Sequence, residues 1–183
     1  AVGAVCFENQ AQFHPLEFLK SISRDIEIYE NTRVLSVHGH VITTDNGVVT
    51  AENIIFATHY PFSNVPGFYF IRQHQERSYV MALEGDEVPD KMSGMYYGID
   101  KGGLSFRCEE GRLLFGGGSH RTGKRDKNCD YEGLSYIKKQ AQRLYPDATV
   151  YAMWAAQDCM PHDRVPFIGR YSVFRPYWYV ATG

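Results

Sequence analysis

The stretch Asn53-Ile54-Ile55-Phe56-Ala57-Thr58-His59 carries the strongest structural signal in this chain. It is mostly apolar, as expected of a strand that is covered on both faces of a sheet. Pro61, Pro66 and Gly67 follow closely and break any regular pattern. The sequence therefore predicts a buried strand here, and a crossing into a second domain directly after it.

Upstream of this strand, the sequence indicates a helix followed by short strands. Pro15 suits the first turn of a helix over residues 13–23, because its missing N–H would have no partner there. Leu16, Leu19 and Ile22 recur on one face of that helix. Asn46-Gly47 is a strong hairpin signal, since both turn positions favour positive φ. We expect strands over residues 26–29, 33–37, 41–44 and 48–50.

Downstream, many short strands separated by turn signals indicate an antiparallel sheet. We expect these strands over residues 68–74, 77–83, 95–100, 104–108 and 112–115, and then a polar, basic loop over 116–128. An amphipathic helix over 131–145 ends before Pro146. A strand over 150–156, a further loop and a strand over 177–181 follow. The fold class is α/β with a mixed architecture.

The composition of the 183 residues is that of an ordinary globular protein, with 44% hydrophobic and 22% charged residues. A formal net charge of -2 argues against a general nucleic-acid or membrane-surface binder, which is normally basic. No apolar run approaches the roughly 20 residues of a membrane span. The four cysteines are scattered without a CxxC pair, so the sequence supports no metal site and favours free thiols in the cytoplasm.

Four stretches together resemble the FAD-dependent oxidoreductases of the D-amino-acid oxidase and glycine oxidase superfamily. They are Phe13-His14-Pro15 with Thr32-Arg33-Val34-Leu35-Ser36-Val37, Asn53 to His59, Asp158 to Gly169, and Val180-Ala181-Thr182-Gly183. Their order and spacing across almost the whole chain make the match more specific than any one motif. The resemblance implies FAD as the cofactor. It also implies contacts to FAD from Val34, Ala57, Thr58, His59, Pro166, Ile168, Gly169, Thr182 and Gly183.

The resemblance implies a domain organisation as well. Residues 1–66 would be part of a Rossmann-like FAD-binding domain, residues 67–150 an antiparallel-sheet substrate domain, and residues 151–183 a return to the FAD-binding domain. The GxGxxG turn that seats the pyrophosphate is missing from this sequence, and Gly116-Gly117-Gly118 opens no helix that would replace it. We therefore expect an internal piece of a longer protein, which by itself binds FAD weakly or not at all.

In this superfamily the flavin accepts a hydride from the carbon next to an amine, and the protein binds and orients the substrate. The resemblance thus implies oxidation of a small amine or amino acid. Arg107 is the first candidate for holding the substrate carboxylate, because a guanidinium offers it two parallel hydrogen bonds. Strand alternation places Arg107 on the same face as Ser105 and opposite to Phe106. A surface arginine on a half-exposed strand is an equal alternative.

Five further residues each have a functional and a structural interpretation. Tyr97 would line the substrate pocket, although tyrosines in strands are more often packing residues. His120 lies in the expected glycine-bordered loop, where backbone can approach a ligand closely; a solvated loop is the alternative. His59 would lie near the flavin or cap the following turn. Asp158 and Asp163 favour hydrogen bonds to loop backbone over a metal site.

Two longer matches point to a particular branch of the superfamily. Ala57-Thr58-His59-Tyr60-Pro61-Phe62 and the stretch from Gly117 to Gly123 are similar to a bacterial subfamily whose members often carry an added Rieske iron–sulfur domain. Such a domain needs paired Cys/His motifs, and none occurs in this sequence. Three functions stay open: an oxidase, a flavin dehydrogenase with a Rieske redox partner, and a non-catalytic ligand-binding or assembly module with the same fold.

Overall fold

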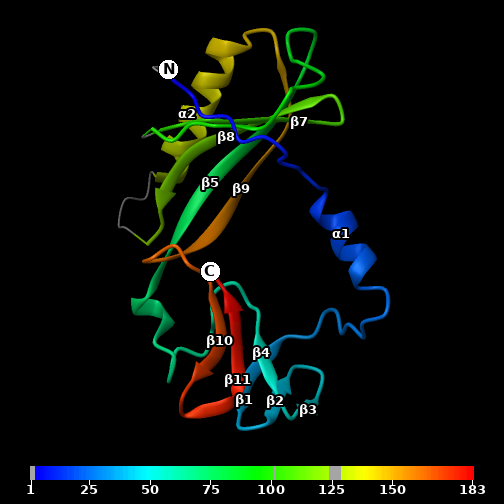
Figure 1. The fold of residues 1–183 in the computed structure, drawn as a ribbon, viewed down its shortest axis with the longest axis vertical. Coiled ribbons are helices and arrows are strands. Elements are labelled where there is room, and N and C mark those ends of the chain that lie inside the picture. The colour runs from blue at the N-terminus through cyan, green and yellow to red at the C-terminus, as the bar shows by residue number, and fades with distance from the viewer. Residues whose placement is uncertain (1–2, 101, 124–128) are drawn as a thin grey trace. The chain divides into compact units, whose positions relative to one another are not determined.

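The computed structural model describes residues 3–100, 102–123 and 129–183, except for the side chains of residues 129–131. The chain forms two compact units, Ala1–Thr50 and Ala51–Gly183. Their helices and strands are labelled in Figure 1. Each unit has its own sheets.

The first unit contains helix α1, Pro15–Ile22, and a three-stranded antiparallel sheet. His14 caps the helix, since its Nδ1 accepts a hydrogen bond from the backbone N–H of Glu17 at 3.3 Å. The sheet has the order β1-β2-β3, with the bounds Val34–His38, Val41–Thr44 and Val48–Thr50. The helix and these three strands confirm the expectations for this part of the chain.

Two other expectations for the first unit were wrong. Residues 26–29 form no strand, and Ile26 and Ile28 are more than half exposed. The hairpin between β2 and β3 exists, but its turn is longer than two residues, because Val48 pairs with Thr43. Asn46 does not adopt positive φ. Its side-chain amide donates instead to the carbonyl of Asn31 at 3.1 Å, which ties the turn to the chain before β1.

The second unit contains a small three-stranded sheet of order β10-β11-β4. Its strands are β4, Ile54–Phe56, β10, Phe167–Ser172, and β11, Arg175–Thr182. Strand β11 pairs in parallel with β4 and antiparallel with β10. The expected buried strand is therefore present, but Ile55 is 66% exposed. Within this chain the strand is covered on one face only, not on both as its apolar sequence suggests.

Aromatic side chains form the core of this small sheet. Phe56, Tyr171 and Trp178 are buried. The ring centroid of Phe56 lies 4.7 Å from that of Tyr171 and 5.3 Å from that of Trp178. Tyr69 also packs here, and its hydroxyl donates to the backbone carbonyl of Tyr171 at 3.1 Å. These contacts fix β4 and β11 side by side.

The larger sheet of the second unit has five antiparallel strands in the order β6-β7-β8-β5-β9. Their bounds are Gln73–Glu84 for β5, Tyr96–Tyr97 for β6, Ser105–Glu109 for β7, Arg112–Arg121 for β8 and Thr149–Pro161 for β9. The expected antiparallel sheet is confirmed. The domain boundary that we expect at residue 150 falls inside β9, and the division of the chain into domains stays a prediction.

Several strand limits differ from those expected. The sequence predicts a strand over 68–74, but Tyr69–Ile71 is a 3-10 helix, η1, and β5 begins only at Gln73. Strands β8 and β9 are longer than predicted, because both continue to pair with β5 along its polar half. His120 and Asp158 therefore lie in strands and not in the loops that the sequence suggests. Strand β10 likewise occupies chain that we expected to be a loop.

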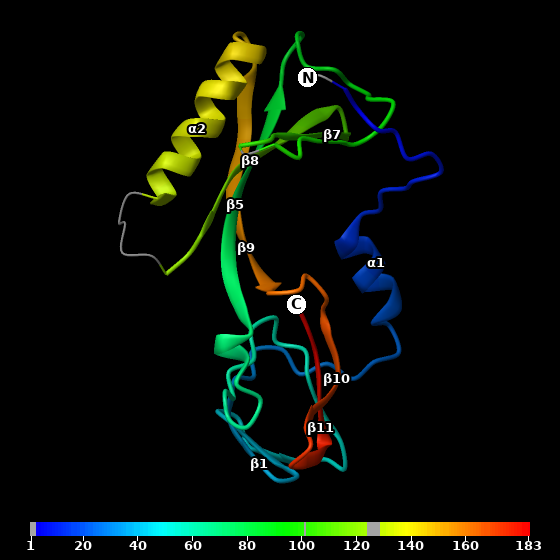
Figure 2. The same ribbon diagram turned by 60° about the vertical axis from the view of Figure 1, so that its left-hand side comes forward.

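Helix α2, Cys129–Leu144, covers one face of the larger sheet, as Figure 2 shows. Tyr79 and Phe115 of the sheet pack with Ile137 of the helix in the main core. Gly133 allows the close approach, since a Cβ there would lie 2.3 Å from the ring of Tyr79. A Cβ on Gly118, whose φ is +67°, would lie 2.7 Å from the carbonyl oxygen of Gly133. The close packing of α2 on β8 therefore requires glycine at position 118.

Candidate functional site

The carboxyl ends of β4 and β11 define one edge of the small sheet. Trp178 pairs with Ile54 and Val180 pairs with Phe56 in a parallel register. Residues 57–59 and residues 182–183 therefore leave the two strands at the same edge. In α/β sheets, ligands bind outside the carboxyl ends of parallel strands. This edge is the candidate site, and we call it the β4–β11 edge.

His59 is held at the β4–β11 edge in an unusual conformation. Its φ is 63°, in the left-handed region, which costs a non-glycine residue roughly 1–2 kcal/mol. Its Nε2 lies 2.7 Å from the backbone carbonyl oxygen of Gln157 on β9. The hydroxyl of Thr182 donates to the carbonyl of His59 itself. The two bonds fix both the ring and the backbone of this residue.

Gly183 closes the edge against the chain after β9. Its φ is +126°, and a Cβ there would lie 2.8 Å from the Cα of Pro166 and 3.0 Å from the Cγ of Pro161. Pro166 is exposed beside it. Ile168 is 80% exposed, and Gly169 has open space where a side chain would lie. The structure thus brings most residues of the predicted FAD contacts to one edge.

A cluster of uncharged polar side chains lies behind His59, where β5, β8 and β9 end. The side-chain amide of Gln157 donates to the side-chain carbonyl of Gln75, and to the Oγ1 of Thr122 at 3.4 Å. The backbone N–H and the hydroxyl of Thr122 both donate to the backbone carbonyl of Gln75, at 2.9 and 3.1 Å. Sequence reasoning missed these three residues, because only the strand register brings them together.

The three predicted catalytic residues lie on two faces of the larger sheet. Tyr97 pairs with Ser105 on β7, and alternation puts both on the same face as Arg107. Phe106 points to the opposite face, where it packs into the core under α2. His120 stacks on the buried ring of Tyr79 with centroids 5.9 Å apart, so it lies on the α2 face.

Tyr97 and Arg107 also differ in their solvent exposure. Tyr97 is 80% exposed, and Arg107 is half-buried. The catalytic roles of Arg107, Tyr97 and His120 stay predictions. Val34 begins β1 in the first unit and is 39% exposed, and its contact with FAD also stays a prediction.

Thiol and metal chemistry have little support in the described part of the chain. Cys6, Cys108 and Cys159 are free cysteines. Burial raises the pKa of Cys159, which keeps this thiol protonated and unreactive at neutral pH. Among the described residues, no group of three or more His, Cys, Asp or Glu side chains is placed to hold a metal ion.

Comparison with known proteins identifies the family. Residues 1–183 match the family of DAO, FAD-dependent oxidoreductases. This chain belongs to that family. A Bacillus subtilis (strain 168) protein, YhfW, which carries the name of a putative Rieske 2Fe-2S iron-sulfur protein, is 33% identical over 195 residues. The match covers 98% of this chain and 37% of that protein, so the chain spans well under half of its relative.

Solved structures show the same fold. Glycine oxidase from Geobacillus kaustophilus superposes with a TM-score of 0.65 at 21% identity, over 85% of this chain and 43% of the oxidase. L-proline dehydrogenase from P. horikoshii superposes with a TM-score of 0.62 at 17% identity, over 84% and 44% of the two chains. The superfamily resemblance and the mixed α/β fold class are confirmed.

FAD, the cofactor of this family, fits part of the β4–β11 edge. Gly183 gives a surface without a side chain, and the space beside Gly169 is open. Exposed Val165 and Ile168 offer apolar contact of the kind that a flavin ring accepts. The glycine-rich turn that would hold the pyrophosphate is not in this sequence. The residues at this edge are therefore chemically suited to contact one part of FAD, and that contact stays a prediction.

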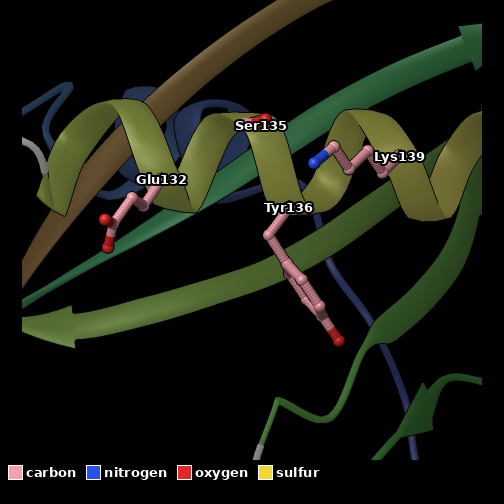
Figure 3. A pocket seen from close by; sticks show the side chains of 4 residues that line it. All are labelled: Glu132, Ser135, Tyr136 and Lys139. Atoms are coloured by element: carbon pink, nitrogen blue, oxygen red, sulfur yellow. The ribbon is translucent and has the colours of Figure 1, made fainter.

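A hollow with no link to the β4–β11 edge lies beside α2. Glu132, Ser135, Tyr136 and Lys139 line it (Figure 3). The hydroxyl of Tyr136 donates to the carbonyl of Gly102 at 2.6 Å. No predicted site residue lines this hollow, so we assign it no function. Among the described helices, none is both long and apolar enough to cross a membrane.

Proposed function

We propose that this chain is part of a longer FAD-dependent oxidoreductase that oxidises a small amine or amino acid. It supplies the substrate-binding sheet and one side of the FAD site. The observation that carries the proposal is the β4–β11 edge, where His59, Thr182 and Gly183 converge at the carboxyl ends of two parallel strands. Bound FAD supplies the hydride acceptor, and the chain's own residues bind and orient the substrate.

Arg107 and Tyr97 are the proposed substrate-binding residues. They share the face of the larger sheet that α2 leaves uncovered. The guanidinium of Arg107 can hold a substrate carboxylate with two parallel hydrogen bonds, and the ring of Tyr97 can cover the substrate from water. Because α2 covers the opposite face, a substrate has access from this side. The amino-acid-oxidising enzymes among the structural relatives support this class of substrate.

Substitution of Arg107 in the longer protein tests this proposal. Arg107→Lys keeps the positive charge but loses the paired hydrogen bonds. We expect KM for a carboxylate-bearing amine to rise roughly 10- to 100-fold, since a charge-assisted bond contributes about 1.5–3 kcal/mol. KM for an amine without a carboxylate should not change. Equal effects on both amines would exclude a carboxylate contact.

Arg112→Lys is the matched control. Arg112 lies in the same sheet, but it has a structural role: its Nε donates to the carboxylate of Glu84 at 3.3 Å, and its guanidinium covers the ring of Tyr151 at 3.8 Å. This variant should leave KM for both amines unchanged.

A second candidate function differs in the electron acceptor. The relative that carries a Rieske name is 33% identical to almost all of this chain. This observation favours a dehydrogenase that passes electrons from the flavin to an iron–sulfur centre rather than to oxygen. Oxidation of the substrate-reduced flavin by oxygen, measured by stopped flow, separates the two functions: reoxidation within seconds favours an oxidase, and reoxidation over many minutes favours the dehydrogenase.

A further inference from the structure

We propose that His59 binds the FAD-site ligand through its Nδ1, which accepts a hydrogen bond from a hydroxyl or N–H group of that ligand. The inference deepens the proposed function and rests on it. It specifies which ring nitrogen of His59 contacts the ligand, and that this nitrogen accepts a hydrogen bond.

The hydrogen bond to β9 fixes the tautomer of His59. The partner of Nε2, at 2.7 Å, is the backbone carbonyl oxygen of Gln157, which can only accept. Nε2 therefore carries the proton. In a neutral imidazole the other nitrogen is then an acceptor, so Nδ1 seeks a donor. Within the described residues, the ring makes this one hydrogen bond.

The site holds the ring rigidly enough for such a role. The side chain of Gln157 is itself bonded to Gln75 and Thr122, which limits movement of its backbone carbonyl. Thr182 holds the carbonyl of His59 from the other strand. A glycine would adopt the same φ of 63° without the steric cost. The backbone alone thus gives no reason for an imidazole here. The bond to Gln157 accounts for Nε2 only, and the proposal concerns Nδ1.

The exposure of His59 leaves its ring open to a ligand at the edge. An Nδ1 acceptor discriminates between parts of a ligand. It attracts hydroxyl and N–H groups and gives nothing to groups that only accept, such as a carbonyl. FAD offers both suitable donors, in the hydroxyls of its ribityl chain and in the imide N–H of its flavin ring. Either source uses the same acceptor on His59.

Two substitutions in the longer protein separate the two nitrogens. Asn is shorter, and its carbonyl oxygen can replace Nδ1 as an acceptor. Gln is longer, and its amide nitrogen can replace the Nε2 donor to Gln157. If Nδ1 binds the ligand, His59→Gln should weaken FAD binding about 2- to 10-fold, as for one neutral hydrogen bond. His59→Asn should bind FAD nearly as tightly as the wild type. Kd is measured by quenching of FAD fluorescence.

The opposite pattern overturns the proposal. Tight binding by the Gln variant would mean that the ring matters only for its bond to Gln157. Equal loss by both variants would mean that an acceptor in the place of Nδ1 does not support binding. His38→Gln, at the exposed end of β1, is the control and should not change Kd. If the wild type itself does not bind FAD, the proposed function fails, which is a distinct result.

Two further measurements sharpen the test. The ¹⁵N chemical shifts of His59 in the neutral ring should show a proton on Nε2, and a proton on Nδ1 would contradict the proposal. Titration with N3-methylated FAD then identifies the donor. If the difference between the Asn and Gln variants persists, the donor is a ribityl hydroxyl; if it disappears, the donor is the imide N–H.

Discussion

At the scale of single residues, Tyr171 shows how burial raises the pKa of a side chain in this fold. It is 3% exposed, and its ring packs against Phe56, Tyr69 and Trp178. Burial and, to a smaller extent, the nearby phenol of Tyr69 raise the pKa of its phenol to about 12. The folded state therefore holds the Tyr171 proton more tightly than the unfolded state, whose phenol has a pKa near 10.0.

This difference predicts a loss of stability at alkaline pH. Between about pH 10 and pH 12 the unfolded chain releases the proton and the folded chain keeps it, so the free energy of unfolding falls as pH rises. Tyr171→Phe keeps the ring and removes the ionisation. The variant should therefore lose less stability than the wild type between pH 9 and pH 11. Urea unfolding at several pH values measures this, and parallel curves for the two proteins would contradict the prediction.

His59 and Gln157 show the limit of prediction from sequence at this scale. The motif that ends at His59 predicts that this residue lies near the cofactor, which stays a prediction; the structure holds it at the carboxyl edge of β4. Nothing in the sequence links it to Gln157, which lies 98 residues away. That contact depends on the register of β5 and β9, and a residue pattern does not encode register by itself.

At the scale of elements, apolar periodicity gave the correct position for the two helices and for the centres of most strands. It failed where a strand continues into polar sequence. The polar half of β5, from Gln73 to Arg77, pairs with β9 and β8 through backbone hydrogen bonds, which need no apolar side chains. The glycines of β8 and the mixed sequence of β9 therefore looked like loops. Gln75, Thr122 and Gln157, the polar cluster behind His59, lie at these strand ends, so the same failure hid them.

The aromatic core beneath β4 and β11 predicts unequal effects for the two tryptophans. Trp178 is 4% exposed and packs on Phe56, whereas Trp154 on β9 is 44% exposed. Trp178→Ala should destabilise the protein by about 3–5 kcal/mol, as expected when a buried aromatic side chain is removed. Trp154→Ala is the matched control and should cost less than half as much. Urea unfolding followed by circular dichroism measures both, and equal losses would contradict the buried role of Trp178.

At the scale of the whole molecule, the family and the fold class could be predicted from the order of four motifs, each weak by itself. The domain division and the site residues stay predictions, because both depend on parts of a FAD site that are not in this sequence. We propose that the β4–β11 edge forms one side of that site, and that substrate binds at the sheet face with Arg107, opposite to the face that α2 covers. Its relative of 33% identity is much longer than this chain.

The most direct test of the central claim is the visible absorbance of the longer protein that contains this chain. It is recorded before and after anaerobic addition of a panel of small amines and amino acids. We predict a bound flavin whose absorbance band bleaches with at least one of these compounds, because the substrate transfers a hydride to the flavin. A colourless protein that stays colourless after addition of FAD would overturn the proposed function and would favour a non-catalytic module with the same fold.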